Sequence, residues 1–165
     1  MRVEYLTGRV LLDTNVLIYA TLAGDSRHAV AREVLALRHR PEVELFISVQ
    51  NLAEMYPNLT GPKNQPPDSP EIAREKILSL SGLRGLTVLP LTLETTRHAL
   101  DLCVEGGVTR QNYFDRQLAA LMIREAIPTI LTENISDFSG IHGINAINPF
   151  CVTYKDSFPR PPDYT

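Results

Sequence analysis

Four acidic residues occupy comparable places beside the apolar segments of this sequence. Asp13 follows the first apolar run of the chain, and Asp137 lies just beyond a later one. Because a carboxylate is costly to bury without a partner, Asp13 is expected at the exposed carboxyl end of a strand, unless it only caps the next helix. Glu54 and Asp115 fall on predicted helices. The carboxyl ends of parallel strands share one rim, so we expect Asp13, Glu54 and Asp137 to meet there.

A pocket that gathers four carboxylates requires positive charge, because like charges raise one another's pKa values. The hard cations Mg²⁺ and Mn²⁺ prefer oxygen ligands and keep several waters, which leaves room for a substrate phosphate. Such a cation activates water and offsets charge on a departing oxygen, so the predicted chemistry is hydrolysis of a phosphodiester bond. Asp115 precedes its strand, and we expect it to join the other acids only if its helix lies across the top of the sheet.

Alternating strands and helices are needed to position these acids. Short apolar runs predict the strands, and periodic apolar positions with caps predict the helices between them. This alternation indicates an α/β fold with three layers, α/β/α, around a central and mainly parallel sheet. The predicted strands cover residues 9–13, 44–47, 87–91, 129–132 and 145–147, and the predicted helices cover 16–20, 27–39, 48–56, 70–81, 93–105 and 113–125.

Two of the predicted helices carry acids of the candidate site. Ser48 is predicted to cap the first, whose buried side is expected to consist of Val49, Leu52, Ala53 and Tyr56. Pro57 is expected to end this helix, so that the proline-rich residues 57–68 form a long loop. In the second helix, the residues expected to face the core are Phe114, Leu118, Leu121 and Met122.

Length and composition indicate one ordinary globular domain. The chain has 165 residues, of which 44% are hydrophobic and 21% charged, and we assign residues 1–150 to the domain and 151–165 to a proline-rich tail. The net charge of −3 gives no general basic face, although bound cations can supply local positive charge. Cys103 and Cys151 fit no zinc spacing, and neither a membrane-spanning run nor a signal-peptide pattern is present. We therefore expect a reduced, cytoplasmic protein.

Four segments resemble the motifs of PIN-domain ribonucleases, and in particular of the VapC-type toxins of bacterial and archaeal toxin–antitoxin pairs. Each segment contains one of the four acids, and the segments occur in the family's order at compatible spacings. The resemblance extends over about residues 9–150. The segments are Leu12–Tyr19, Ile47–Glu54, Asp115–Leu121 and Leu131–Phe138.

The resemblance implies an endoribonuclease that cleaves single-stranded or structured RNA with Mg²⁺ or Mn²⁺. Asp13, Glu54, Asp115 and Asp137 would be its catalytic and metal-binding acids, Asp137 at the family's most variable acidic position. Residues at supporting positions are Thr14, Asn15, Ser48 and Thr132. Glu133 is an extra acid, expected to be a surface charge. The partners implied are RNA, a small antitoxin and a second copy in a homodimer, with helices 27–39 and 70–81 as candidate contact surfaces; no membrane is implied.

The sequence is also compatible with other functions. A PIN-like scaffold could bind RNA or protein without catalysis, and a PIN nuclease could process RNA without being a toxin. A receiver or aspartyl-phosphate phosphatase also has Asp at strand ends, but Asn15 stands where the phosphatase needs a second Asp. Beside Asp115, the candidates for RNA contact are Arg110, Tyr113 and Arg116, through phosphate charge or base stacking. For the two arginines, a salt bridge to the acid is the alternative.

Overall fold

Five parallel strands form the central sheet of the computed structural model, which describes residues 6–151. The strands are β1 (Gly8–Leu12), β2 (Val43–Ser48), β3 (Leu86–Leu89), β4 (Thr129–Leu131) and β5 (Asn145–Ile147). Their order is β3-β2-β1-β4-β5, so β1, which leads to Asp13, lies at the centre and β3 at an edge. Short apolar strands of this kind suit a sheet that is covered on both faces. Of the predicted tail, residues 152–165 lie outside the described residues.

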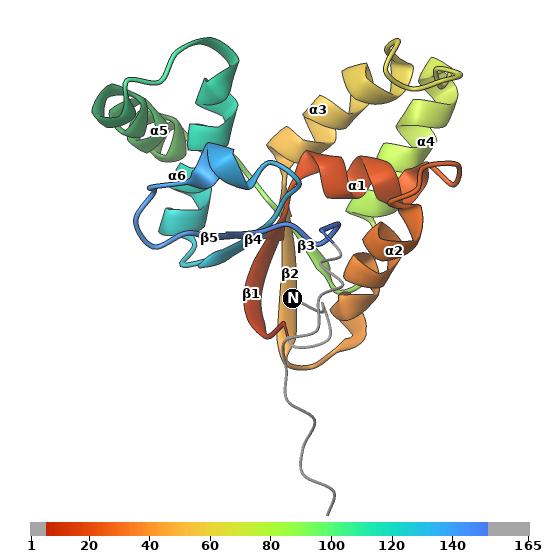
Figure 1. Cartoon of the computed structure of the whole chain (residues 1–165), viewed down its shortest axis with the longest axis horizontal. Helices are drawn as coiled ribbons and strands as arrows, with labels where there is room; N and C mark the ends of the chain where they lie inside the picture. The colour runs from red at the N-terminus through yellow and green to blue at the C-terminus, as the bar shows by residue number, and fades with distance from the viewer. Residues whose placement is uncertain (1–5, 152–165) are drawn as a thin grey trace, which may run out of the picture.

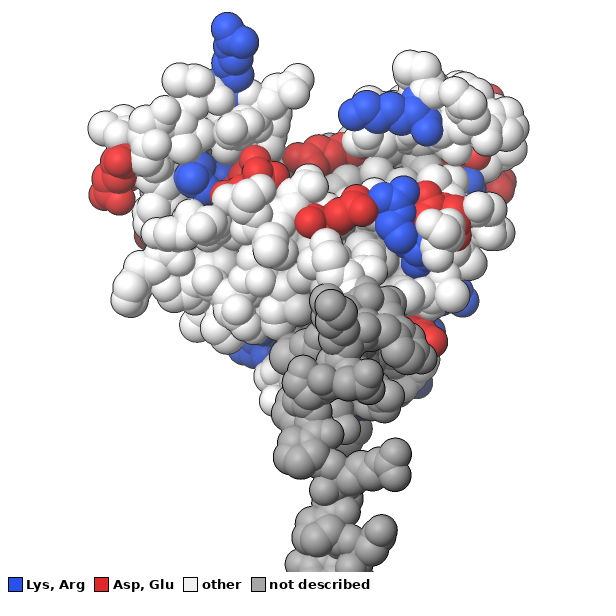
Figure 2. Space-filling model, in the orientation of Figure 1, with Lys and Arg blue, Asp and Glu red and all other residues white. Residues whose placement is uncertain are grey.

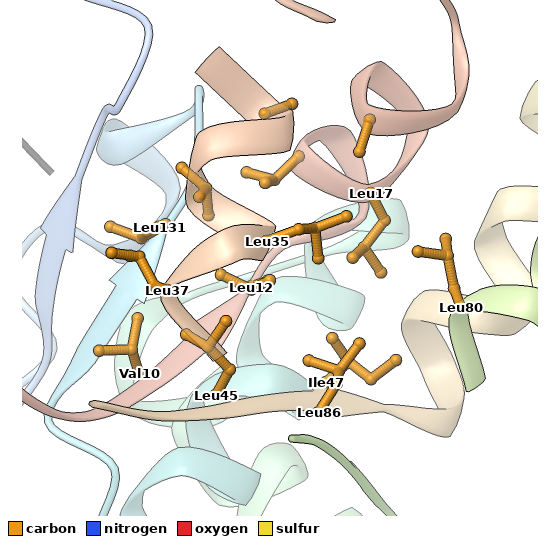
Figure 3. Close-up of a cluster of buried hydrophobic side chains, with 14 of the residues drawn as sticks. Val10, Leu12, Leu17, Leu35, Leu37, Leu45, Ile47, Leu80, Leu86 and Leu131 are labelled. Atoms are coloured by element: carbon orange, nitrogen blue, oxygen red, sulfur yellow. The ribbon is translucent and has the colours of Figure 1, made fainter. Parts of the chain in front are cut away.

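Within the described residues, six α-helices accompany the sheet: α1 (Thr14–Thr21), α2 (His28–Ala36), α3 (Val49–Thr60), α4 (Pro70–Ser81), α5 (Leu93–Gly106) and α6 (Tyr113–Arg124). Successive residues of β1 point to opposite faces and divide between two cores. Val10 and Leu12 pack beneath α1 to α4, whereas Leu11 packs against α6, which in turn packs on α5 (Figures 1 and 3). The predicted three-layer α/β/α fold is thereby confirmed. None of the described helices is long and apolar enough to cross a membrane.

Helix α3 is longer than the sequence predicts. Pro57 is expected to end it, yet α3 continues to Thr60 with the proline inside the helix. A proline removes one backbone hydrogen bond and usually bends or ends a helix. Here Met55 and Leu59 are fully buried on either side of Pro57, so their packing into the core holds the last turn. The predicted loop 57–68 is therefore confined to residues 61–68.

The inward faces of α3 and α6 also differ from the prediction. Val49 and Tyr56 are 47% and 42% exposed, Ala53 is exposed, and Leu52 is only partly buried. The buried face of α3 consists instead of Gln50, Asn51, Met55 and Leu59. Two hydrogen-bonded amides thus occupy places that an apolar pattern would fill with aliphatic side chains. In α6 the predicted core residues Leu118, Leu121 and Met122 are buried, but Phe114 is 45% exposed.

Asp115 lies at the carboxyl ends of the strands, although its helix does not lie across the top of the sheet as the prediction required. A helix that leads into a parallel strand runs antiparallel to that strand, so its first turn lies at the rim where the strands end. Helix α6 does this on its way to β4, and it packs on the face of the sheet rather than across the top. A hydrogen bond of 2.9 Å from Gln50 Nε2 to the carbonyl of Phe114 joins the starts of α3 and α6.

Candidate active site

Three neighbours fix the Asp13 carboxylate at the start of α1. Asp13 is the N-cap of this helix, and its Oδ1 accepts a hydrogen bond of 2.6 Å from the backbone N–H of Thr14. Its Oδ2 accepts bonds of 2.6 Å from the Thr132 hydroxyl and 2.7 Å from Asn15 Nδ2. Burial raises the pKa of Asp13, the bonds from Thr132 and Thr14 lower it, and two nearby acids raise it further. Asp13 is therefore both a helix cap and a member of the acidic cluster.

The Glu54 carboxylate is held at both of its oxygens. Oε2 accepts a hydrogen bond of 2.7 Å from the Thr14 hydroxyl, and that hydroxyl accepts one of 3.0 Å from Asn51 Nδ2. Oε1 accepts a bond of 2.8 Å from Gln50 Nε2, one helical turn earlier on α3. Glu54 is thus oriented from its own helix and from α1.

Asp115 is the least restrained of the four acids. No hydrogen bond from the described residues reaches its carboxylate, and the side chain is partly buried. Burial raises the pKa of Asp115 to about 7, the charges of Asp137, Asp13 and Glu54 add to the rise, and Arg116 opposes it. Asp137 lies in a short helical turn after β4, where its carbonyl accepts a hydrogen bond of 2.7 Å from Arg116 Nη1. The four acids therefore share one electrostatic environment.

This cluster interacts through charge without forming a complete set of metal ligands. Among residues 6–151, no three His, Cys, Asp or Glu side chains are arranged to hold an ion directly. The Asp13 and Glu54 oxygens are instead hydrogen-bonded within the protein. Mg²⁺ usually binds through one or two carboxylates, with waters and substrate phosphates filling its other positions. A donor set of carboxylates alone fits that cation, and it lacks the nitrogen and sulfur ligands typical of zinc.

The residues predicted at supporting positions lie around these acids. Hydrogen bonds to the carboxylate of Asp13 or Glu54 come from Thr14, Asn15 and Thr132. Ser48 caps α3, and its hydroxyl accepts a bond of 3.0 Å from the backbone N–H of Gln50. The contacts of Thr14, Asn15 and Thr132 orient the carboxylates. That these four supporting residues contribute to activity stays a prediction.

The three candidates for RNA contact lie where α5 leads into α6. Arg110 is exposed and has a φ of 58°, in the left-handed region that residues other than glycine rarely adopt. Tyr113 is partly buried, and its hydroxyl accepts a hydrogen bond of 3.1 Å from Gln117 Nε2. Arg116 is partly buried and bonded to the Asp137 carbonyl. Arg110 is therefore the most accessible of the three.

Sequence reasoning missed two features of the site. Gln50 and Glu54 are four residues apart and share a helix face, which is the one signal in the sequence that could have indicated their contact. Glu133 was expected to be a surface charge, but it pairs with Arg27 at 2.8 Å and accepts a hydrogen bond of 2.5 Å from the Tyr19 hydroxyl. This pairing ties the segment after β4 to α1 and to the start of α2.

A hollow lies above the strand ends, between the projection formed by α3 and α4 and the one formed by α5 and α6 (Figures 1 and 2). Figure 2 shows acidic side chains along its floor and basic side chains on both projections. A separate, mainly apolar groove of about 360 Å³ contains none of the four acids. It is lined by Tyr56, Pro70, Glu71, Arg74, Ile77 and Leu78.

Comparison with known proteins agrees with this architecture. The sequence model of the family described as PIN domain matches residues 10–141. A search of curated protein sequences finds no match. Among solved structures, one similar protein is VapC20 of Mycobacterium tuberculosis, described as a toxin that cleaves the sarcin–ricin loop. It is 19% identical to this chain with a TM-score of 0.62, and the match covers 82% of this chain and 98% of VapC20.

Two further solved structures come from toxin–antitoxin complexes. VapBC2 of Rickettsia felis, bound to a DNA fragment from its promoter, is 22% identical with a TM-score of 0.60, covering 86% of this chain and 98% of that chain. VapBC-1 of nontypeable Haemophilus influenzae is 19% identical with a TM-score of 0.62, over the same shares of 86% and 98%. At these identities the likeness establishes the fold.

Proposed function

This chain belongs to the PIN domain family, whose sequence model matches residues 10–141, and on that premise we propose that it is a metal-dependent endoribonuclease. The observation that carries the proposal is the convergence of Asp13, Glu54, Asp115 and Asp137 from four separate segments, with the pKa of Asp115 raised to about 7 by burial and by the other three acids. Carboxylates whose pKa is raised by burial and by neighbouring acids cluster at functional sites. The proposed substrate is single-stranded or structured RNA.

The two kinds of acid have different tasks in this proposal. Asp13 and Glu54 are held by hydrogen bonds and provide fixed negative charge on the floor of the hollow. Asp115 and Asp137 are less restrained, so they can turn toward the scissile phosphodiester and accept the proton of the attacking water. Arg110, Tyr113 and Arg116 lie beside Asp115 along the chain, and we assign them to contacts with the RNA backbone and bases.

The chemistry of the donor set supports Mg²⁺ or Mn²⁺ as the cofactor, held by Asp13, Glu54, Asp115 and Asp137. When bound, such a cation supplies positive charge to the phosphate and lowers the pKa of water at the site. Basic side chains lie on both projections and acidic ones lie along the floor between them, so we propose that the RNA backbone is attracted to the rim of the hollow and not to the acids themselves (Figure 2).

The relatives solved as toxin–antitoxin complexes support a toxin role, with a small antitoxin as partner, in the cytoplasm where cellular RNA is available. We propose residues 1–150 as the nuclease domain and 151–165 as a separate tail. A homodimer is also proposed, although α2 is a poor candidate for its interface because Val34 and Leu35 are buried in the core of the chain itself. Helix α4 exposes Leu78 to 50%, and α5 exposes Leu100 to 51% and Val104 to 84%, so these helices are the better candidates.

The proposed activity is tested with purified protein and a mixed pool of unstructured and hairpin RNA oligonucleotides. We expect internal cleavage with Mg²⁺ or Mn²⁺ and none with EDTA, and end-mapping of the fragments would give the preferred sequence. Binding of the pool without cleavage in either metal would instead support a non-catalytic PIN scaffold. Growth arrest on expression, relieved by a co-expressed small neighbouring protein, would separate a toxin from an RNA-processing nuclease.

A further inference from the structure

Gln50 connects two parts of the candidate site that otherwise belong to different layers. Helix α3 packs on α1 and α4 over one face of the sheet, and α6 packs with α5 over the other (Figure 1). Gln50 Nε2 donates one hydrogen bond of 2.8 Å to Glu54 Oε1 and another of 2.9 Å to the carbonyl of Phe114. Phe114 immediately precedes Asp115. One amide group therefore links the acid on α3 to the start of the helix that carries Asp115.

The identity of the donor atom follows from its partners. A carboxylate oxygen and a backbone carbonyl both accept hydrogen bonds, so the atom between them must be the amide nitrogen with its two hydrogens. Both N–H groups of Gln50 are then used, and its orientation is fixed. The opposite oxygen of Glu54 is bonded to Thr14, so without Gln50 this carboxylate would be tied to α1 alone.

The other end of the same amide argues against a purely structural role. Gln50 is only 5% exposed, and within residues 6–151 its Oε1 is buried and accepts no hydrogen bond. A buried acceptor that is left unpaired destabilises the fold, and an aliphatic side chain of similar size has no such acceptor. The unpaired Oε1 therefore offsets part of the stability that the two hydrogen bonds of Nε2 contribute.

We propose that Gln50 is a positioning residue, which holds the Glu54 carboxylate at a fixed place relative to the first turn of α6 and so sets the spacing between the acids of the two layers. This inference rests on the proposed metal-dependent activity, because the spacing matters only if the acids act together on a cation and a phosphate. Residues that orient metal-binding carboxylates in this way typically change metal affinity or activity by about 10–100-fold when removed.

The test compares Gln50→Leu and Gln50→Asn with a control, Asn64→Leu. Asn64 is also buried, at 9% exposure, and donates through Nδ2 to the Leu59 carbonyl at 2.8 Å, away from the acids. Leucine at position 50 removes both donors and the unpaired oxygen, whereas asparagine keeps the amide but is too short to reach both acceptors. Calorimetric titration with Mn²⁺ gives the affinity, thermal unfolding in EDTA gives the stability, and RNA cleavage gives the activity.

We expect the affinity of Gln50→Leu for Mn²⁺ to fall about 10–100-fold. Its unfolding temperature in EDTA should change little, because the variant loses the hydrogen bonds to Glu54 and Phe114 together with the unpaired oxygen, and these changes oppose each other. Gln50→Asn should lose affinity similarly, and it serves as the test if the leucine variant does not fold. Asn64→Leu should be less stable and bind Mn²⁺ as the wild type does. Wild-type affinity and activity in both Gln50 variants would overturn the inference, as would an affinity loss that only parallels lost stability. Absence of Mn²⁺ binding and cleavage in the wild type would instead contradict the proposed function.

Discussion

The two halves of the candidate site treat the same kind of side chain in opposite ways. On the side of β1 and α3, Asp13 and Glu54 accept hydrogen bonds at both carboxylate oxygens. On the side of α6 and the turn after β4, Asp115 receives no hydrogen bond from the described residues, and its pKa is raised to about 7 by burial and by neighbouring acids. Asp13 and Glu54 are held by hydrogen bonds, whereas the charge of Asp115 is opposed only by that of Arg116 among the groups that shift its pKa.

This difference suggests how stability and function are divided within one cluster. Hydrogen bonds favour the ionised form of a carboxylate, so they offset part of the cost of burying Asp13. Asp115 has no such offset, and its ionised form destabilises the fold unless a cation approaches. Asp13 and Glu54 should therefore contribute to both stability and activity. Asp115 should contribute to activity and reduce stability.

The largest effect should come from Asp115→Asn, which removes the charge and keeps the shape of the side chain. We expect RNA cleavage to fall by orders of magnitude, because the variant holds the cation less well. At pH 8 in EDTA the variant should nevertheless unfold at a higher temperature than the wild type, because a partly buried charge is removed and the repulsion from the other acids is relieved. Cleavage rates and thermal unfolding of the same preparations measure both effects.

A matched control for this substitution is Asp101→Asn on the exposed surface of α5, which should leave cleavage unchanged. If Asp115→Asn were as active as that control, Asp115 would have no part in the site. If it were inactive but less stable than the wild type, the contrast between the two halves would be wrong.

Asp13→Asn should reduce activity as well, but with the opposite effect on stability. The amide can keep one acceptor oxygen for the Thr14 N–H, and its nitrogen then faces the donor Asn15 Nδ2. Loss of cap and side-chain bonds of this kind costs about 1–2 kcal/mol. Urea unfolding at pH 8 in EDTA should show a lower free energy of unfolding than in the wild type. Equal or greater stability would mean that Asp13 is no better accommodated than Asp115.

The sheet and the positions of the acids along the chain could be predicted from the sequence, whereas the contrast between the two pairs of acids could not. The parallel sheet and the place of Asp13 after its first strand follow from apolar runs and caps, which are local signals. The buried face and the end of α3 were predicted wrongly, because Gln50 and Asn51 are buried in it and Pro57 lies inside the helix. Both features depend on contacts with residues far away in the sequence, so no local sequence pattern predicts them.

The exposure of Phe114 and the pairing of Glu133 have the same origin. A hydrophobic residue on a periodic helix predicts burial, but Phe114 lies in the first turn of α6 and is 45% exposed. Glu133 looks like a solvated charge until the fold brings Arg27 and Tyr19 beside it. The sequence gives correct positions for the acids, after β1 and β4 and on α3 and α6, but it does not give the partners that orient them.

In the absence of metal, pH should have a smaller effect on the stability of the folded protein. The pKa of Asp115 lies at about 7 in the folded protein, above its ordinary value of 3.8, so the folded state binds this proton more tightly than the unfolded chain. Between about pH 4 and pH 7 the stability contributed by this group should therefore fall as pH rises. Thermal unfolding in EDTA from pH 5 to pH 8 should show a decline that is weaker in Asp115→Asn. The same decline in both proteins would assign it to other groups.

The most direct test of the central claim is the thermal unfolding of the wild type and of Asp115→Asn at pH 8 in EDTA, Mg²⁺ and Mn²⁺. A cation that binds only the folded site at about 100 times its dissociation constant stabilises the fold by roughly 2.7 kcal/mol. For a domain of this size, that corresponds to an increase in unfolding temperature on the order of several degrees. We predict this increase for the wild type in both metals and a clearly smaller one for the variant. Identical unfolding curves of the wild type in EDTA and in millimolar metal would contradict the claim that these four acids form a metal-dependent nuclease site.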